Sequence, residues 1–391
     1  MLNIAVAHTL ELDMKDAIED LLTQCQEQLG ELIPQAGLLF TGIDLDYPAI
    51  LNGINKAYPG IDLIGCTDYS ELSSVQGVAD DSICLTLFYS NELTFRSGIA
   101  ENIFKDPYRK IKKAIKTTVR NVEQKPDLCI VTPTSHFFGS SGTKFLNILD
   151  LVNGMKQNLG ENFPIIGGAG VHANWKGDTQ FHNEQFYHNA VPFLLIYGPI
   201  KYSLGVASGW VPIGKKTKIS KADGCNIFRI GEQTALDFYR HYLGEFDFMG
   251  MLEYPLAIFD EGEENFYLKA PTLFDAEEGS IHFQTTIPEG ATVQLTHSTR
   301  DKVIEGVKES VDSAISQYSG ERPSIALCFT CMARKIVLGT RVQEEYEVLK
   351  AKLPDIPFAG FYTGGEIGPL APGKPTRHHN ETFLTLLLGT E

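Results

Sequence analysis

The sequence predicts a two-domain α/β chain with mixed β-sheets flanked by helices, and repeated spacing is the main evidence for it. Three apolar runs close on a glycine, at Ile64-Gly65, Ile166-Gly167 and Ala359-Gly360. An apolar run ending in threonine lies upstream of each, and a longer β-type run lies downstream. Helical periodicity fills the interval between the threonine run and the glycine run. These observations predict three repeated helix-strand-helix-strand-strand units, each with a right-handed parallel crossover.

The three units are expected at about residues 14–90, 107–198 and 300–389. Residues 200–298 do not fit the unit, because short strand-like runs alternate there with Gly and Pro turns. This stretch is predicted to be a β-rich insert with a helix over 234–242, closed by Gly244.

The first helix of each unit should cover 14–29, 108–122 and 302–318 in turn. We place a domain boundary at about residue 215, which gives a domain of residues 1–215 and a second of residues 216–391.

Composition excludes several classes of protein. The 391 residues include 33 Lys and Arg against 49 Asp and Glu, a net charge of −16, which argues against a nucleic-acid partner. No apolar run approaches the roughly 18 residues of a membrane span, so we expect no membrane insertion. The N-terminus lacks the cationic stretch of a secretory signal, and seven scattered cysteines indicate reduced thiols. We therefore expect a cytoplasmic protein.

Several runs resemble the two FIST domains, whose name stands for F-box and intracellular signal transduction. Residues 235–244 (ALDFYRHYLG) and 358–369 (FAGFYTGGEIGP) resemble the FIST C domain. Residues 64–71 (IGCTDYSE) and 209–214 (GWVPIG) resemble the FIST N domain. The resemblance covers nearly the whole chain.

The resemblance implies a sensory module that binds small ligands. In layout the chain is similar to stand-alone bacterial members that bind haem, sense nitric oxide and act on a partner histidine kinase. The chain has no room for a kinase or cyclase output domain of its own, so we expect any signal to pass through a separate protein. The cofactor stays unknown at this stage, with haem as one candidate.

Ligand-binding candidates follow the glycine-closed strands, because ligands of open α/β sheets bind beyond the carboxyl ends of strands. Glu71 and Glu366 share an equal offset, six residues past their glycines. The structural alternative is that the glycines form tight turns, while the acidic side chains are solvated or cap helices. The candidates are Gly65, Cys66, Thr67, Glu71, Gly168, His172, Tyr362, Thr363 and Glu366. We expect one site shared between the two halves, near Cys66 and Tyr362.

Haem would need an axial ligand in an apolar pocket, usually a histidine. His136, His172 and His241 are the candidates, and each could equally be a structural residue. The resemblance does not distinguish among them.

Three classes of function stay open. We favour a ligand-binding sensor, not an enzyme, with a small metabolite such as an amino acid as the alternative to haem. A cysteine-dependent enzyme would use Cys66 or Cys331 as its nucleophile and needs a base such as His136 or His172 within reach. An interaction scaffold would leave the glycine-flanked loops without a ligand.

Overall fold

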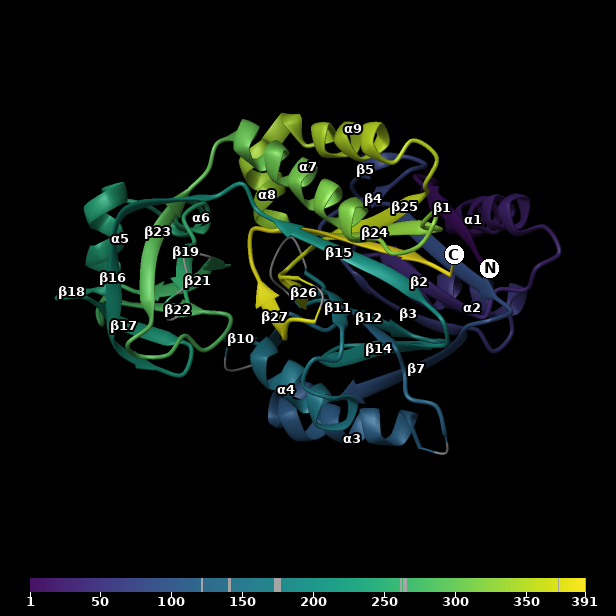
Figure 1. The fold of residues 1–391 in the computed structure, drawn as a ribbon, viewed down its shortest axis with the longest axis horizontal. Helices are drawn as coiled ribbons and strands as arrows, with labels where there is room; N and C mark the ends of the chain where they lie inside the picture. Colours follow the sequence, from purple (N-terminus) through teal and green to yellow (C-terminus); the bar gives the residue numbers. More distant parts are fainter. Residues whose placement is uncertain are drawn as a thin grey trace.

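The computed structural model describes residues 1–120, 122–139, 142–171, 177–260, 262, 266–371 and 373–390. It confirms the α/β class, with mixed sheets flanked by helices. Three similar units form the larger body at the right of Figure 1, and the insert stands apart at the left. In the described part of the chain, no helix is both long and apolar enough to cross a membrane.

The first unit begins with a strand and a helix whose limits follow from capping. Asp13 accepts hydrogen bonds from the backbone N–H groups of Lys15 and Asp16, and Gly30 ends the helix with φ 60°. The elements are β1 (Leu2–Thr9), α1 (Met14–Leu29), β2 (Ala36–Thr41), α2 (Tyr47–Ala57), β3 (Asp62–Thr67), β4 (Glu71–Ser73), β5 (Gly77–Ala79) and β6 (Ile83–Ser90).

The second unit follows the same order with one addition. Residues 136–139 and 142–145 form a pair of antiparallel strands, and the next helix begins only after them, with Asn147 as its N-cap. The elements are β7 (Thr94–Glu101), η1 (Ile103–Lys105), α3 (Pro107–Thr118), β8 (Leu128–Val131), β9 (His136–Gly139), β10 (Gly142–Phe145), α4 (Ile148–Leu159), β11 (Ile165–Gly168), β12 (Gln180–His182), β13 (Gln185–Tyr187) and β14 (Ala190–Tyr197).

The third unit is interrupted by the insert after its first strand. It comprises β15 (Lys201–Ala207), α7 (Arg300–Gln317), β24 (Ile325–Cys331), α8 (Met332–Leu338), η2 (Gly339–Arg341), α9 (Gln343–Lys352), β25 (Phe358–Thr363), β26 (Glu366–Pro369), β27 (Thr376–His379) and β28 (Phe383–Gly389). The three predicted repeats are therefore present. The helix expected over 108–122 ends earlier, at Thr118.

The units are joined by exchange of hairpins. Each contributes a sheet of four strands, in the orders β1-β6-β2-β3, β7-β14-β8-β11 and β15-β28-β24-β25. A hairpin from another unit then pairs with the last strand: β12-β13 with β3, β26-β27 with β11, and β4-β5 with β25. Each sheet is thus completed by a neighbour, and the three units close into a ring.

The central core lies among the three sheets, with helices on their outer faces. Phe40 from the first unit lies 4.4 Å from Phe361 of the third, measured between ring centroids, and Phe329 packs against Phe361 at 5.8 Å. Ile130 brings the second unit into the same apolar cluster. Burial of this surface stabilises the ring at about 25 cal/mol per Å².

The three repeated glycines are required by close contact between parallel strands. A Cβ atom on Gly65, Gly167 or Gly360 would lie 1.8, 1.9 or 1.7 Å from the carbonyl oxygen of Leu39, Val131 or Cys328, respectively. Any side chain would therefore force the central parallel pair of the sheet apart. The repeated glycine is thus a packing residue of the sheet.

The insert forms its own antiparallel sheet. The elements are β16 (Val211–Asp223), β17 (Asn226–Ile230), β18 (Gln233–Thr234), α5 (Ala235–Leu243), α6 (Phe248–Leu252), β19 (Leu256–Phe259), β20 (Phe266–Lys269), β21 (Pro271–Asp275), β22 (Ser280–Phe283) and β23 (Thr292–His297). The predicted boundary at 215 falls within β16 and stays a prediction.

An apolar cluster fastens the insert to the third unit. Buried Trp210 packs there with Leu268 of the insert and Val303 of α7. The Trp210 indole N–H donates a 2.9 Å hydrogen bond to the carbonyl oxygen of Glu253, so its polar atom is satisfied.

Replacing the first repeated glycine tests the contact between parallel strands. Gly65→Ala should lower the free energy of unfolding by about 3 kcal/mol or more, because its Cβ would meet a backbone carbonyl. Urea unfolding followed by circular dichroism measures this. Gly250→Ala is the matched control, since its nearest neighbouring atom would lie 3.4 Å away. Equal unfolding midpoints for the two variants would contradict the packing role.

Candidate functional site

The loops that follow β3, β11 and β25 meet where the three units join. The Tyr69 N–H donates to the carbonyl oxygen of Tyr362 at 3.4 Å, and the Ala169 N–H to that of Gly365 at 2.9 Å. The Val171 N–H donates to the carbonyl oxygen of Thr67 at 3.3 Å. The structure therefore brings the three candidate loops together in one junction.

The candidate residues of this junction are deeply buried. Cys66, Glu71, Tyr362, Thr363 and Glu366 each expose 0% of their surface. Gly168 lies against Thr363, since a Cβ on this glycine would come within 2.3 Å of the threonine methyl group. The polar side chains among them are hydrogen-bonded to protein neighbours: Thr363 to Glu366, Glu71 to Ser82 and Tyr362 to Glu345.

Glu366 has three protein donors. The Thr363 hydroxyl donates to one carboxyl oxygen, while the Thr382 hydroxyl (2.6 Å) and the Thr382 N–H (3.1 Å) donate to the other. Burial raises the pKa of Glu366 to about 7, against the opposing effect of these bonds. The Tyr362 hydroxyl is bonded to Glu345, which also pairs with the buried Arg334 at 2.8 Å.

Glu71 takes part in a buried relay of side chains. The His8 ring lies 2.7 Å from the Ser73 hydroxyl through Nδ1 and 2.7 Å from the Ser82 hydroxyl through Nε2. Ser82 is in turn hydrogen-bonded to Glu71. Burial raises the pKa of Glu71 to about 8 and lowers the pKa of His8 to about 4, so both groups are neutral near pH 7.

The sequence analysis did not identify the residue of the second unit that corresponds to Glu71 and Glu366. Glu71 and Glu366 each pair, on the adjacent strand, with the residue that follows a repeated glycine. In the second unit the equivalent position is occupied by Gln180, which pairs with Cys66. Gln180 lies thirteen residues past Gly167, whereas Glu71 lies six past Gly65. The longer loop of the second unit hides the equivalence.

Asp178 was also missed. It accepts hydrogen bonds from the Thr134 hydroxyl and from the Ser135 N–H, the latter at 2.9 Å. Burial raises the pKa of Asp178 to about 7. The junction thus contains several buried carboxyl groups whose pKa is raised. In the sequence, the only signal for Asp178 is that it is a polar loop residue beside a repeated strand.

The two candidate nucleophiles lie in surroundings that disfavour a thiolate. Burial raises the pKa of both Cys66 and Cys331, and nearby carboxyl groups raise it further. Cys331 ends β24 and lines a small chamber of about 40 Å³ together with Gly364 and Glu381.

Two of the three alternative haem ligands lie within the described residues, in different parts of the fold. His136 is buried in β9, where its Nδ1 atom lies 2.7 Å from the Ser135 hydroxyl. His241 lies exposed on α5, with its ring against Tyr242. His172 lies outside the described residues. Among the residues that are described, no group of three or more His, Cys, Asp or Glu side chains could hold a metal ion.

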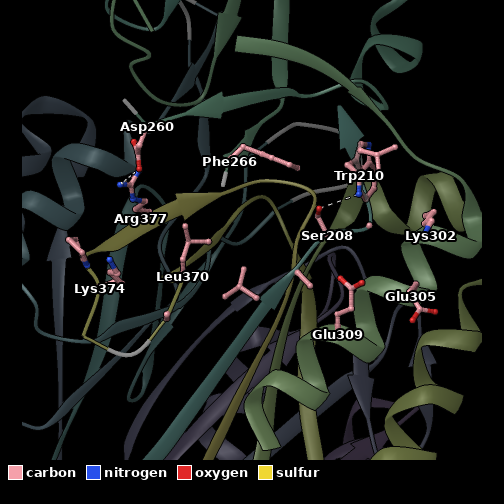
Figure 2. A pocket seen from close by; sticks show the side chains of 16 residues that line it. Ser208, Trp210, Asp260, Phe266, Lys302, Glu305, Glu309, Leu370, Lys374 and Arg377 are labelled. Atoms are coloured by element: carbon pink, nitrogen blue, oxygen red, sulfur yellow. Dashed lines mark hydrogen bonds and ion pairs between the residues drawn. The ribbon is translucent and has the colours of Figure 1, made fainter. Parts of the chain in front are cut away.

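A larger hollow lies between the insert and the third unit. This groove measures about 640 Å³ and is lined by the link 206–211, by Asp260 and Phe266, by one face of α7 and by Leu370, Ala371, Lys374, Pro375 and Arg377 (Figure 2). Apolar lining comes from Trp210, Phe266 and Leu370. The link includes part of the run 209–214 that carries the resemblance, but none of the lining residues was a site candidate.

Charges of opposite sign face each other across the groove. Lys374 and Arg377 lie on one side, whereas Glu305 and Glu309 extend from α7 on the other (Figure 2). Arg377 is paired with Asp260 at 2.8 Å, and Glu305 lies 3.5 Å from Lys308. Within the described residues, Glu309, Lys374 and Lys302 have no ion-pair partner. Of these, Glu309 and Lys374 carry opposite charges on opposite sides of the groove, so they are the pair most suited to a ligand with two charges.

Comparison with known proteins places both domains in one family. A model described as the FIST N domain matches residues 35–233, and a model described as the FIST C domain matches residues 235–369. The two matches together span most of the chain.

The chain is also similar to proteins of bacteria and archaea. An uncharacterized protein of Mycobacterium bovis is 24% identical over 383 residues, covering 94% of each chain. One from Methanocaldococcus jannaschii is 23% identical over 340 residues, covering 81% of this chain and 62% of the relative. Among solved structures, cyanuric acid hydrolase from A. caulinodans has a TM-score of 0.40 at 8% identity, covering 100% of this chain and 99% of that one. A likeness this weak supports no argument.

The buried Glu71 carboxyl predicts a specific dependence of stability on pH. Because its pKa is raised from 4.5 to about 8 in the folded protein, stability falls as pH rises through this window and levels off above it. The Glu71→Gln variant has the same residue type as Gln180 and cannot ionise. Its free energy of unfolding should therefore fall by roughly 1 kcal/mol less per pH unit than that of the parent.

Urea unfolding at pH 5 and pH 8 measures the effect. Glu71→Gln should gain stability relative to the parent at pH 8 but much less at pH 5. Glu27→Gln on the exposed face of α1 is the control and should show the same difference at both pH values. A parallel pH profile for Glu71→Gln and the parent would show that the carboxyl ionises normally.

Proposed function

We propose a site and a ligand class for this chain, which belongs to the FIST family of signal-transduction sensory domains. The ligand is a small zwitterionic metabolite with an apolar body, of which an amino acid is the simplest case. It binds in the groove between the insert and the third unit.

The opposed charges of the groove carry this proposal. A ligand carboxylate would be held by Lys374 on the side of β27, and a ligand ammonium by Glu309 on α7. The apolar surface of Trp210, Phe266 and Leu370 would receive the side chain between these two charges. A simple anion or cation would satisfy only one wall.

The position of the groove supports a sensory role. Its walls come from the insert and from the third unit, so a ligand that contacts both favours the arrangement in which they are held together. Output through a separate signalling protein, such as a histidine kinase, belongs to this proposal. Such a partner would distinguish the bound from the free arrangement of the insert.

The groove does not suit haem. Of the side chains that line the groove, none is a His, Cys, Met or Tyr that could serve as an axial ligand. The chamber that does contain Cys331 and Met332 measures about 40 Å³, too small for a porphyrin. We therefore assign haem and nitric oxide no part in the proposed mechanism.

A ligand screen with groove variants tests the proposal. Thermal shift with each common amino acid should identify at least one that raises the melting temperature, and calorimetry gives its Kd. Glu309→Gln and Lys374→Met should each weaken that binding by about tenfold, because each removes one charged contact. Neither side chain is buried, so the fold should persist.

Glu347→Gln is the matched control, since Glu347 is an exposed carboxylate on α9 outside the groove. It should bind like the parent chain. The groove proposal fails if no amino acid shifts the melting temperature, or if both groove variants bind as tightly as the control.

A further inference from the structure

A buried lysine at the contact between the insert and the core stands outside the groove and the junction. Lys269, the last residue of β20, exposes only 5% of its surface. Its Nζ atom donates a 2.8 Å hydrogen bond to the carbonyl oxygen of His378 on β27 and lies 3.2 Å from the Nδ1 atom of the same residue.

Lys269 has no ion-pair partner in the part of the chain that the structure describes. A buried ammonium without a carboxylate beside it is costly, and the usual outcome is loss of its proton. Burial and the nearby Arg377 lower the pKa of Lys269 to about 7, while Glu366 and Cys225 act weakly in the opposite sense. The neutral fraction at pH 7 is therefore about a thousandfold larger than for an ordinary lysine.

The amine borders a hollow that is equipped for a polar ligand. This hollow measures about 90 Å³ and is also lined by Tyr267, Thr285, Arg377 and His378. The Thr285 hydroxyl is 2% exposed and finds no hydrogen-bond partner within the described residues. Buried hydroxyl groups are normally bonded, so this one indicates an occupant.

We propose that Lys269 forms a Schiff base with a small 2-oxo acid bound in this hollow. The Thr285 hydroxyl and the Arg377 guanidinium, which also pairs with Asp260, would hold the carboxylate, while the Lys269 amine faces the carbonyl carbon. An aldehyde without an acid group would lack these two contacts.

The chemistry is balanced without a further reactant. The neutral amine attacks the carbonyl carbon and forms the N–C bond, which gives a carbinolamine after a proton moves from nitrogen to oxygen. The carbinolamine then loses the hydroxyl group and the remaining amine proton as water, leaving the C=N bond. The reaction is reversible, as a sensor of metabolite concentration requires.

This site is separate from the groove. The two hollows share only Arg377, which lines both. A lysine adduct would thus be detected whether or not an amino acid binds in the groove, and failure of one proposal leaves the other standing.

Reductive trapping tests the inference on the whole chain. The protein is incubated at pH 7 with pyruvate and cyanoborohydride, and the modification of each lysine is followed over time by peptide mass spectrometry. Lys269 should be modified at least about tenfold faster than any exposed lysine, such as Lys113. Thr285→Val should slow the trapping at Lys269 several-fold without changing the rate at Lys113.

Two further variants complete the design. Lys269→Arg should abolish the fast phase, whereas Lys113→Arg, the matched control on an exposed residue, should leave it intact. The inference is overturned if the label spreads over exposed lysines at similar rates, if Lys269 stays unmodified, or if Thr285→Val traps as fast as the parent. The rates at individual lysines in the parent chain decide the matter even if Lys269→Arg fails to fold.

Discussion

Exchange of hairpins between units is the constraint on which the rest of the structure depends. Each sheet ends on a strand that is completed by a hairpin from a neighbour, so no unit has a finished sheet of its own. The same arrangement draws the loops after β3, β11 and β25 into one junction, where backbone groups of different units bond to each other. Side chains at this junction are consequently excluded from water, and this burial raises the pKa of Glu71, Asp178 and Glu366.

Local patterns in the sequence predict the repeats but not their assembly. Helical periodicity and the glycine-closed runs mark the strands and helices of each unit, because these signals depend on neighbouring residues. The exchange of hairpins pairs strands such as β4 and β25, which are nearly 300 residues apart, and no local pattern specifies such a partner. The glycines were expected to admit a ligand or to form turns; their structural reason is a carbonyl oxygen on the adjacent strand, as at Gly360 beside Cys328.

The candidate sites differ in how far the sequence could indicate them. Equal offsets identified Glu71 and Glu366, whereas a longer loop concealed Gln180. Neither Glu309 nor Lys374 could be identified, because each looks like an ordinary surface charge until the insert and the third unit form a groove. No pattern in the sequence singles out Lys269, since its burial arises from packing of β20 against β27. Sites between separate segments are therefore the ones that local patterns miss.

The insert is the part of the molecule that would link these sites to signalling under the proposed function. It stands apart from the ring, yet it contributes to the groove and to the hollow beside Lys269 (Figure 1). The most direct test is hydrogen exchange, with and without the amino acid that shifts the melting temperature most. Binding in the groove predicts protection of residues 206–211, of the first turns of α7 and of residues 373–377 together. Protection confined to residues 66–71 and 362–366 would instead place the ligand at the junction and contradict the account.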